Sequence, residues 1–277
     1  MRKDGSVRLL VLALPGLAAL AFFFLLPLAA VVSGAIAPDT LRRLFASADL
    51  MDALLRSLSL GAIAGLVSLI VAIPVALHLS TLPAGLRAAL QLAIALPLTF
   101  SGLIVAYGFI LVFGRAGFAT LLGAEIGIDP SWLSGLLYSP VGLVAAYAYF
   151  LIPRAVLILL PVLLNFDWRQ VHAAESLGAG RLRALCDILF PQLTPSLFSA
   201  FCLMMAIAIG AYGTALALIG SQINILPLRI YSLVSDSGAD FPLASAASLL
   251  LMAVCTLVMA MAEIFSVYRE GKHVRHR

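Results

Sequence analysis

Arg154 is the one strong charge that lies deep inside an apolar run of this sequence. Placing an arginine at the centre of a membrane-spanning helix costs about 2.5–3.5 kcal/mol on insertion scales, so its side chain is expected to face protein or water. There it can meet an anionic solute. It can also extend to the lipid headgroups, or bond carbonyls that Pro153 leaves free. The structural role is the more usual one, and the sequence leaves both open.

Hydroxyl side chains within other apolar runs could line a path for a solute. Such groups donate and accept hydrogen bonds, but they are also ordinary packing and interface groups of membrane helices. Together with Arg154, the candidates for a translocation path are Thr99, Ser101, Tyr107, Tyr147 and Tyr212.

The sequence carries none of the short patterns that mark common catalytic sites. It has no GxxxxGK[ST] loop to hold nucleotide phosphates, no GxSxG turn and no HExxH pair. Aspartates and glutamates fall in connecting segments, at the ends of apolar runs or in the tail, and the cysteines lack metal-ligand spacing. We therefore expect no catalytic residue, no metal site and no cofactor on this chain.

Membrane helices are expected to position these side chains. Of 277 residues, 63% are hydrophobic and 11% are charged, whereas a soluble domain has about 25% charged residues. A bilayer core about 30 Å thick requires about 20 apolar residues in a helix. The sequence predicts an all-α integral membrane protein with six transmembrane helices: roughly Leu9–Val32, Leu54–Leu79, Ala88–Phe113, Pro140–Leu164, Pro195–Ile219 and Ala244–Val267.

Features within and between these runs refine the prediction. Gly61 and Gly65 form a GxxxG pattern, which permits close contact between two helices. Prolines such as Pro97 lie inside apolar runs and can kink or break them. Most lysines and arginines outside the runs lie on the side of the N-terminus, which predicts that both termini are cytoplasmic. The cytoplasmic set is Arg2, Lys3, Arg8, Arg87, Arg169, Arg181, Arg183, Arg269, Lys272, Arg275 and Arg277.

The segment 165–190 is a long connector on the predicted cytoplasmic side. Its residues favour a helix over Asp167–Leu177, with the aspartate as its cap. Gly178 is placed to adopt the left-handed conformation that ends a helix. A second helix is predicted over Arg181–Leu189, ending at Pro191. The sequence therefore predicts a helix-turn-helix that lies across the cytoplasmic face.

The residues of this loop match a family signature. The EAA signature reads EAA, three residues, G, nine residues, then I-x-L-P. The loop is similar to it, with the glycine, isoleucine and proline in register, and so resembles the permease subunits of binding-protein-dependent ABC importers. The matching residues are Ala173-Ala174-xxx-Gly178-x9-Ile188-x-Phe190-Pro191.

By this resemblance, the loop forms coupling helices that seat in a groove on a nucleotide-binding subunit. His172 stands where the family has a glutamate, and Phe190 stands where it has a leucine. Glu175 lies one helical turn along and can supply the missing acid. The expected coupling residues are His172, Ala173, Ala174, Glu175, Gly178, Ile188 and Pro191.

The resemblance covers about 54–261 and is closest to the group handling sulfate, molybdate, ferric iron, thiamine, polyamines and phosphonates. Leu54–Leu60, Leu96–Leu98, Ser139–Leu143 and Gly210–Ala215 also look like family segments. The expected organisation is an N-terminal tail, first helix and outer loop over 1–53, the importer transmembrane domain over 54–268, and a basic cytoplasmic tail over 269–277.

The resemblance implies a permease of the bacterial inner membrane that works with other subunits. These are a cytosolic ABC ATPase dimer that carries ATP and Mg, a second permease of the same or a different chain, and an extracytoplasmic substrate-binding protein. No nucleic-acid partner is expected, because the basic residues flank apolar runs as lipid anchors do.

An ion- or proton-coupled secondary transporter is the alternative. Such proteins usually place acidic residues or histidines at mid-membrane, where this sequence has none.

Overall fold

The computed structural model describes residues 13–220, 223–235 and 239–274, and helices make up nearly all regular structure in these ranges. Six helical stretches are long and apolar enough to cross a membrane. They are Ala13–Ala35, Ala48–Thr81, Gly102–Glu125, Pro140–Leu164, Arg181–Ile209 and Phe241–Tyr268.

The elements are the π-helical turn η1 (Ala21–Leu25), α2 (Leu26–Ala35), α3 (Pro38–Ala46), α4 (Ala48–Thr81), α5 (Ala84–Ala95), the 3₁₀ turn η2 (Leu96–Thr99), α6 (Gly102–Phe113), α7 (Phe118–Glu125), α8 (Pro130–Leu137), α9 (Pro140–Leu164), α10 (Arg169–Ser176), α11 (Arg181–Ala184), the π-helical turn η3 (Leu185–Leu189), α12 (Phe190–Ile209), α13 (Tyr212–Ile219), α14 (Leu226–Ser235) and α15 (Phe241–Val274).

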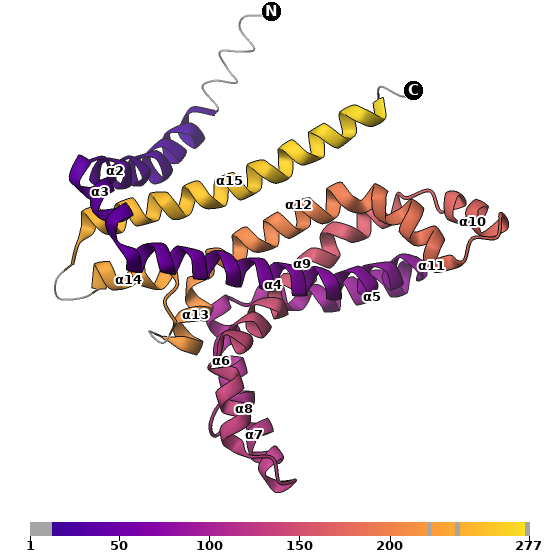
Figure 1. Ribbon diagram of the computed structural model, residues 1–277, viewed down its shortest axis with the longest axis horizontal. Coiled ribbons are helices and arrows are strands. Elements are labelled where there is room, and N and C mark those ends of the chain that lie inside the picture. The colour runs from indigo at the N-terminus through magenta and orange to yellow at the C-terminus, as the bar shows by residue number, and fades with distance from the viewer. Residues whose placement is uncertain (1–12, 221–222, 236–238, 275–277) are drawn as a thin grey trace, which may run out of the picture.

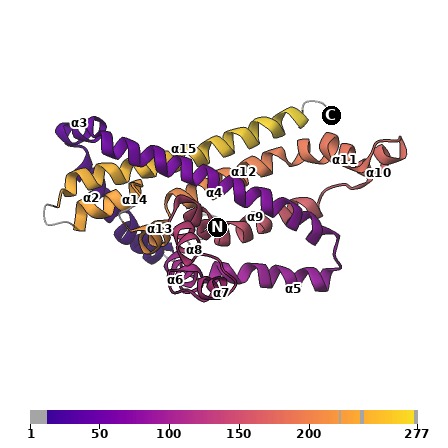
Figure 2. The same cartoon turned by 60° about the horizontal axis from the view of Figure 1, so that its bottom comes forward.

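Three long helices, α4, α12 and α15, run along the long axis of the molecule (Figure 1). Helix α4 packs against α9 and α12, and α12 also packs against α15. Helices α10 and α11 lie at one end of this bundle, and α3 and α14 lie at the other (Figures 1 and 2). We call these the α10 end and the α14 end.

The predicted GxxxG contact is confirmed on α4. A Cβ atom added to Gly61 would lie 2.7 Å from Cγ1 of Ile209 and 3.1 Å from the carbonyl oxygen of Met205. One added to Gly65 would lie 3.3 Å from the amide nitrogen of Met205. Because only hydrogen fits at these positions, α4 and α12 approach each other closely.

Three of the predicted membrane helices lie within continuous helices. Leu54–Leu79 falls within α4, Pro140–Leu164 coincides with α9, and Ala244–Val267 falls within α15. The predicted first helix starts at Leu9, which is outside the described residues, as are Arg2, Lys3, Arg8, Arg275 and Arg277.

The predicted helix Ala88–Phe113 is wrong as a single helix. Helix α5 ends at Ala95, a 3₁₀ turn follows, and Phe100 is extended at φ −90° and ψ 141° before α6 begins. Pro97 lies in this turn and lacks the amide that would continue the hydrogen bonding of α5, while Leu96 before it keeps helical backbone at φ −51° and ψ −43°. The hydroxyl of Ser101 then accepts a hydrogen bond from the amide of Ile104 at 3.4 Å and starts α6.

The predicted helix Pro195–Ile219 is also wrong as a single helix. Helix α12 ends at Ile209, and Ala211 takes φ −78° and ψ 72° before α13 begins. Gly210 lies at this break, where its low helix propensity favours an end. Helices α6 and α13 follow the two breaks and pack against each other. Helices α6, α7 and α8 extend away from the long axis (Figure 1).

Ion pairs join separate elements at the α14 end. Asp49 of α4 pairs with Arg229 of α14 and accepts a hydrogen bond from Asn224 at 2.7 Å. Asp240, next to the start of α15, pairs with Arg43 of α3. These contacts fix α3, α14 and the start of α15 around the N-terminal turn of α4.

Replacing Gly61 with alanine should destabilise the bundle by about 1–3 kcal/mol, because the new methyl group overpacks the α4–α12 contact. The thermal unfolding midpoint of the purified protein in detergent measures this effect. Gly108→Ala is the matched control, since a Cβ atom there meets nothing within 4 Å. Equal midpoints for the two variants would contradict the close contact.

Asp240→Asn should lower stability at neutral pH by up to about 1 kcal/mol, because the pair is partly exposed. Hydrogen bonds from Arg43 and the backbone of Leu243 lower the pKa of this carboxyl group. The ionised form therefore stabilises the folded state above the ordinary aspartate pKa, and this contribution is lost as the pH falls. Unfolding midpoints of the parent and variant should differ at pH 7 and converge once the pH falls below the lowered pKa of this carboxyl group. Arg43→Gln should show the same pattern, and a difference that persists in acid would refute the pair.

Candidate coupling loop and translocation path

The connector between α9 and α12 folds as the predicted helix, turn and helix. The carboxylate of Asp167 accepts a hydrogen bond from the amide of Arg169, 3.1 Å away, at the start of α10. The indole nitrogen of Trp168 donates to the carbonyl of Leu163 at 3.2 Å, which ties this start to α9. The side chain of Val171 is buried beneath α10. The loop is therefore fixed to the bundle.

Gly178 adopts the predicted left-handed conformation, with φ +93°. The amide of Ala179 bonds the carbonyl of Ala174 at 3.0 Å, and that of Gly178 bonds the carbonyl of Glu175 at 3.0 Å. This pair of bonds is the Schellman motif, which ends a helix at a residue with positive φ. The turn thus depends on glycine at this position.

Apolar side chains on both sides of this turn point into solvent. Leu177 is 90% exposed and Leu182 is 80% exposed. Ala173 is exposed, while Ala174 is half-buried. Nδ1 of His172 lies 3.2 Å from Oε2 of Glu175, so the two residues act as a pair at the position where the family signature has its acid. The loop presents a small, partly apolar surface with a polar pair beside it.

The second helix of the loop continues past Pro191, so its predicted end there is wrong. Helix α11 leads into the π-helical turn η3, in which the amide of Phe190 bonds the carbonyl of Leu185, and then directly into α12. Proline lacks the amide that an α-helix would pair with the carbonyl four residues earlier. The wider π turn just before Pro191 accommodates it within the helix. Ile188 is half-buried and Pro191 is exposed.

Three of the predicted path residues line one cavity of about 520 Å³ between α6, α9 and the break before α13. These are Ser101, Arg154 and Tyr212. Arg154 is half-buried and makes no hydrogen bond or ion pair among the described residues, so it does not bond the carbonyls near Pro153. The remaining lining is Leu98, Phe100, Gly102, Leu103, Phe150, Ile207, Gly210, Ala211, Gly213 and Thr214.

The other three predicted path residues lie outside this cavity's lining. Tyr107 is 55% exposed on α6. Thr99 is exposed, and its hydroxyl donates to the carbonyl of Leu96 at 2.7 Å. Tyr147 is 2% exposed, and its hydroxyl donates to the carbonyl of Ala211 at 3.0 Å. Tyr147 therefore has a structural contact at the helix break.

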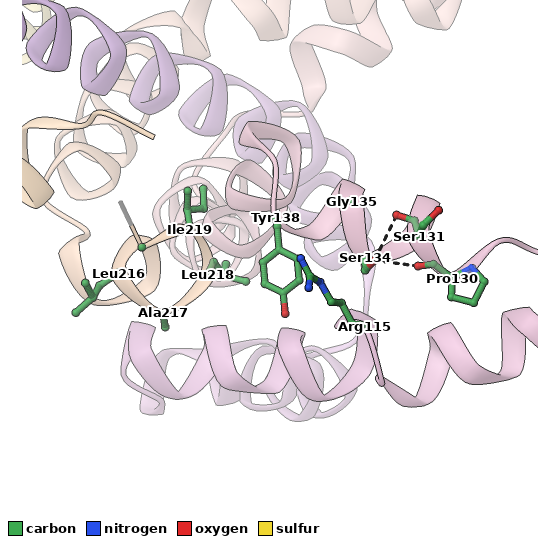
Figure 3. Close-up of a pocket in the computed structure, with 11 residues that line it drawn as sticks. Arg115, Pro130, Ser131, Ser134, Gly135, Tyr138, Leu216, Ala217, Leu218 and Ile219 are labelled. Atoms are coloured by element: carbon green, nitrogen blue, oxygen red, sulfur yellow. Dashed lines mark hydrogen bonds between the residues drawn. The ribbon is translucent and has the colours of Figure 1, made fainter. Parts of the chain in front are cut away.

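Sequence reasoning missed Thr214 and Arg115. Thr214 is buried, and its hydroxyl has no partner among the described residues. Arg115 lines a second cavity of about 930 Å³, which the last residues of α13 also line. Figure 3 shows Arg115 and Tyr138 between Ser131 and Ser134 of α8 and the residues Leu216–Ile219 of α13. The positions of both residues beside the cavities depend on how α6, α8 and α13 pack together, which no local sequence pattern reveals.

Comparison with known proteins identifies the family. Residues 61–267 match the model of the binding-protein-dependent transport system inner membrane component. The chain belongs to this family. It is therefore a permease subunit of an ATP-driven importer rather than a secondary transporter, and a multi-pass inner-membrane protein.

Named relatives and a solved structure agree over most of this permease. It is 29% identical over 274 residues to the permease protein PhnU of a 2-aminoethylphosphonate transport system of Salmonella typhi, which covers 94% of this chain and 90% of the relative. It is 27% identical over 218 residues to the spermidine/putrescine permease protein PotB of Haemophilus influenzae, covering 78% and 73%. A bacterial alginate ABC transporter, solved with an alginate-bound periplasmic protein, contains a chain of the same fold, with TM-score 0.74, 20% identity and 95% of each chain covered.

Replacing Gly102 with alanine in this permease should destabilise the α6–α13 contact. The added Cβ atom would lie 2.4 Å from the hydroxyl oxygen of Thr214. Thr214→Ala removes that unpartnered hydroxyl and should restore the stability of Gly102→Ala by about 1 kcal/mol or more. Thermal unfolding of the two single variants and the double variant measures the coupling, and strictly additive effects would contradict the contact.

Proposed function

We propose that residues 165–191 of this permease dock on a separate cytosolic ATPase and pass its motion to the membrane helices. ATP and Mg bind on that partner, which carries out hydrolysis. The coupling residues are His172, Ala173, Ala174, Glu175, Gly178, Ile188 and Pro191. Docking on the ATPase places the α10 end and both termini in the cytoplasm.

The surface of the loop supports docking. The exposed side chains of Leu177 and Leu182 flank the turn at Gly178. Exposed leucines on a water-facing loop bury apolar area only when another protein covers them. The His172–Glu175 pair lies on the same helix as Ala173 and offers a polar contact beside this apolar patch. The small residues allow a partner's groove to close around α10.

The observation that carries the proposal is that two helices run without interruption from the loop to the cavity. The helical stretch Arg181–Ile209 begins in the loop and ends at the break beside the cavity. At a rise of about 1.5 Å per residue, its 29 residues extend about 44 Å. Helix α9 carries Arg154 and ends in the same loop. Displacement of the loop therefore moves two helices that line the cavity.

Side-chain contacts keep α10 in register with both helices. Trp168 bonds the carbonyl of Leu163 on α9. Gln192 of α12 donates from Nε2 to Oε1 of Gln170 on α10 at 2.7 Å. Because α10 is held from both sides, a force on it is transmitted to the helices. ATP-driven closure of the partner then switches the permease between inward-open and outward-open states as packed bodies.

The permease pairs with a second permease chain, the same or a different one, and an extracytoplasmic binding protein delivers the solute. The periplasmic protein in the alginate transporter structure supports a partner of this kind. The relatives PhnU and PotB are named for solutes of different charge, so their names do not decide which solute this permease carries.

Gly178→Val should uncouple ATP hydrolysis from transport. A β-branched residue at φ +93° is strained by about 1–2 kcal/mol or more, so the turn reshapes and α10 leaves its docking position. The measurement is ATPase activity of the reconstituted transporter with and without solute-loaded binding protein. We expect stimulation to be lost while membrane insertion is kept.

Gly180→Val is the matched control in the same loop. Gly180 has φ −64°, and a Cβ atom added there meets nothing within 4 Å. This variant should keep most of the stimulation. Full stimulation in Gly178→Val would refute the docking role of the loop.

A further inference from the structure

We propose that the 520 Å³ cavity beside α13 binds the anionic oxygen-rich group of the transported solute, with Arg154 as its counter-charge. The proposal rests on the function proposed above and names the solute class: molecules that carry a sulfate, phosphate, phosphonate or carboxylate group.

The charge of the cavity is not compensated by the protein. Arg154 lines it, and no aspartate or glutamate is among its lining residues. Within the described ranges, Arg154 bonds neither a carboxylate nor a carbonyl. It is residue 15 of the 25 in α9, which places it about 15 Å from the α10 end of that helix. A charge at this depth is stabilised by a counter-ion or by water, because lipid cannot solvate it.

The end of α13 that lines this cavity adds to the positive potential. Tyr212, Gly213 and Thr214 form the first turn of α13 and line the cavity, and no side chain caps this end. The first amides of a helix lack intrahelical partners, and the helix dipole is positive there. The amide of Tyr212 bonds the carbonyl of Gly210 at 2.8 Å, which leaves those of Gly213 and Thr214 as the donors of this turn. The cavity therefore combines an arginine with backbone donors at a helix N-terminus, an arrangement that suits an oxyanion.

Further donors lie at the same place. Ser101 and Tyr212 are two more polar residues of the lining. Thr214 also lines the cavity, is 1% exposed, and has a hydroxyl without a partner among the described residues. Its oxygen lies against Gly102 of α6, where an added Cβ atom would come within 2.4 Å of it, so the unpaired polar group that carries the site is Arg154.

The larger cavity at the other end of α13 provides an internal comparison. Arg115 lines it together with Leu216–Gly220, the C-terminal end of the helix (Figure 3). Carbonyl groups at that end carry a negative partial charge, which a nearby cation neutralises. Arg115 therefore shares its cavity with the negative end of α13, whereas Arg154 shares its cavity with the positive end.

A binding measurement on the complete transporter tests the proposal. The transporter is purified in maltoside micelles, and binding of radiolabelled sulfate is followed at constant ionic strength. Unlabelled phosphate and methylphosphonate serve as anionic competitors, and putrescine serves as the cationic control. We expect saturable sulfate binding that the anions displace and putrescine does not. Absence of binding by all three anions, or displacement by putrescine, would overturn the proposal.

Arg154→Gln should weaken anion binding at least tenfold, because a hydrogen-bonded counter-charge is lost. Ser101→Ala removes a hydroxyl that also caps α6, so it should weaken binding less than Arg154→Gln while lowering the thermal unfolding midpoint. Arg42→Gln is the matched control, since Arg42 is exposed on α3, has no ion pair among the described residues and lines neither cavity. Equal affinities for Arg154→Gln and Arg42→Gln would overturn the assignment.

Two further experiments separate a solute anion from a lipid phosphate, and the anion site from the coupling role of the loop. Repeating the titration in phosphatidylcholine nanodiscs distinguishes solute from lipid, because a lipid phosphate that fills the cavity would abolish sulfate binding there and overturn the solute assignment. ATPase stimulation is measured on the same preparations. If anion binding does not depend on Arg154 while ATPase stimulation is normal, only the anion-site inference is refuted. If anion binding depends on Arg154 but Gly178→Val leaves ATPase stimulation unchanged, only the coupling role of the loop is refuted.

Discussion

Inside a bilayer, a backbone group that leaves its helix has no water to bond, and this constraint shapes the centre of the permease. Two breaks occur, one after Ala95 and one after Ile209. The hydroxyl of the buried Tyr147 bonds the carbonyl of Ala211, the residue with the least helical backbone at the second break. Helices α6 and α13 then cover each other. The Tyr147 contact supports the second break, and residues of both breaks line the cavity with Arg154.

The second break also fixes where the long helix that starts in the loop ends. Helix α12 is continuous from the loop to Ile209 because η3 accommodates Pro191 without interrupting it. In the proposed mechanism, a helix that ended at Pro191 would absorb a movement of α10 at a flexible joint beside the loop. A continuous helix would instead carry the displacement to Gly210, where the backbone changes direction. The proposed coupling and the shape of the cavity thus depend on the same helix.

Much of the fold and loop can be predicted from sequence because each feature has a local cause. Apolar length predicts α9 from Pro140 to Leu164, and the Schellman turn follows from Gly178. Proline alone is a poor guide to breaks. Pro153 lies inside a continuous helix, whereas Pro97 lies in a 3₁₀ turn after which the helix ends at Phe100. The difference is that Ser101 can cap a new helix four residues after Pro97, so the chain has an alternative to continuing.

The cavity could be predicted only in part, because its properties arise from tertiary contacts. Ser101, Arg154 and Tyr212 were recognisable as polar groups in apolar runs, and the fold brings them together. Tyr147 is a tyrosine within an apolar run, as Tyr212 is, yet its hydroxyl donates a hydrogen bond to the carbonyl of Ala211. Thr214 is unpaired because α6 lies against it, with Gly102 at the contact. Sequence lists polar candidates, and packing decides which of them remain available.

The orientation of α13 links these observations. A short helix has two ends of opposite partial charge, which matter most where the dielectric constant is low. The C-terminal end of α13 shares a cavity with Arg115, a cation beside the negative end. The N-terminal end shares a cavity with Arg154, where two positive contributions meet. The empty state of this second cavity is therefore electrostatically costly, and an entering anion lowers that cost. This electrostatic cost returns when the anion leaves. The cavity therefore favours the anion-bound state only while its helices keep Arg154 beside the N-terminal end of α13. In the proposed mechanism, movement of α9 and α12 would change the distance between Arg154 and α13, so the displacement that opens the path would also weaken the site.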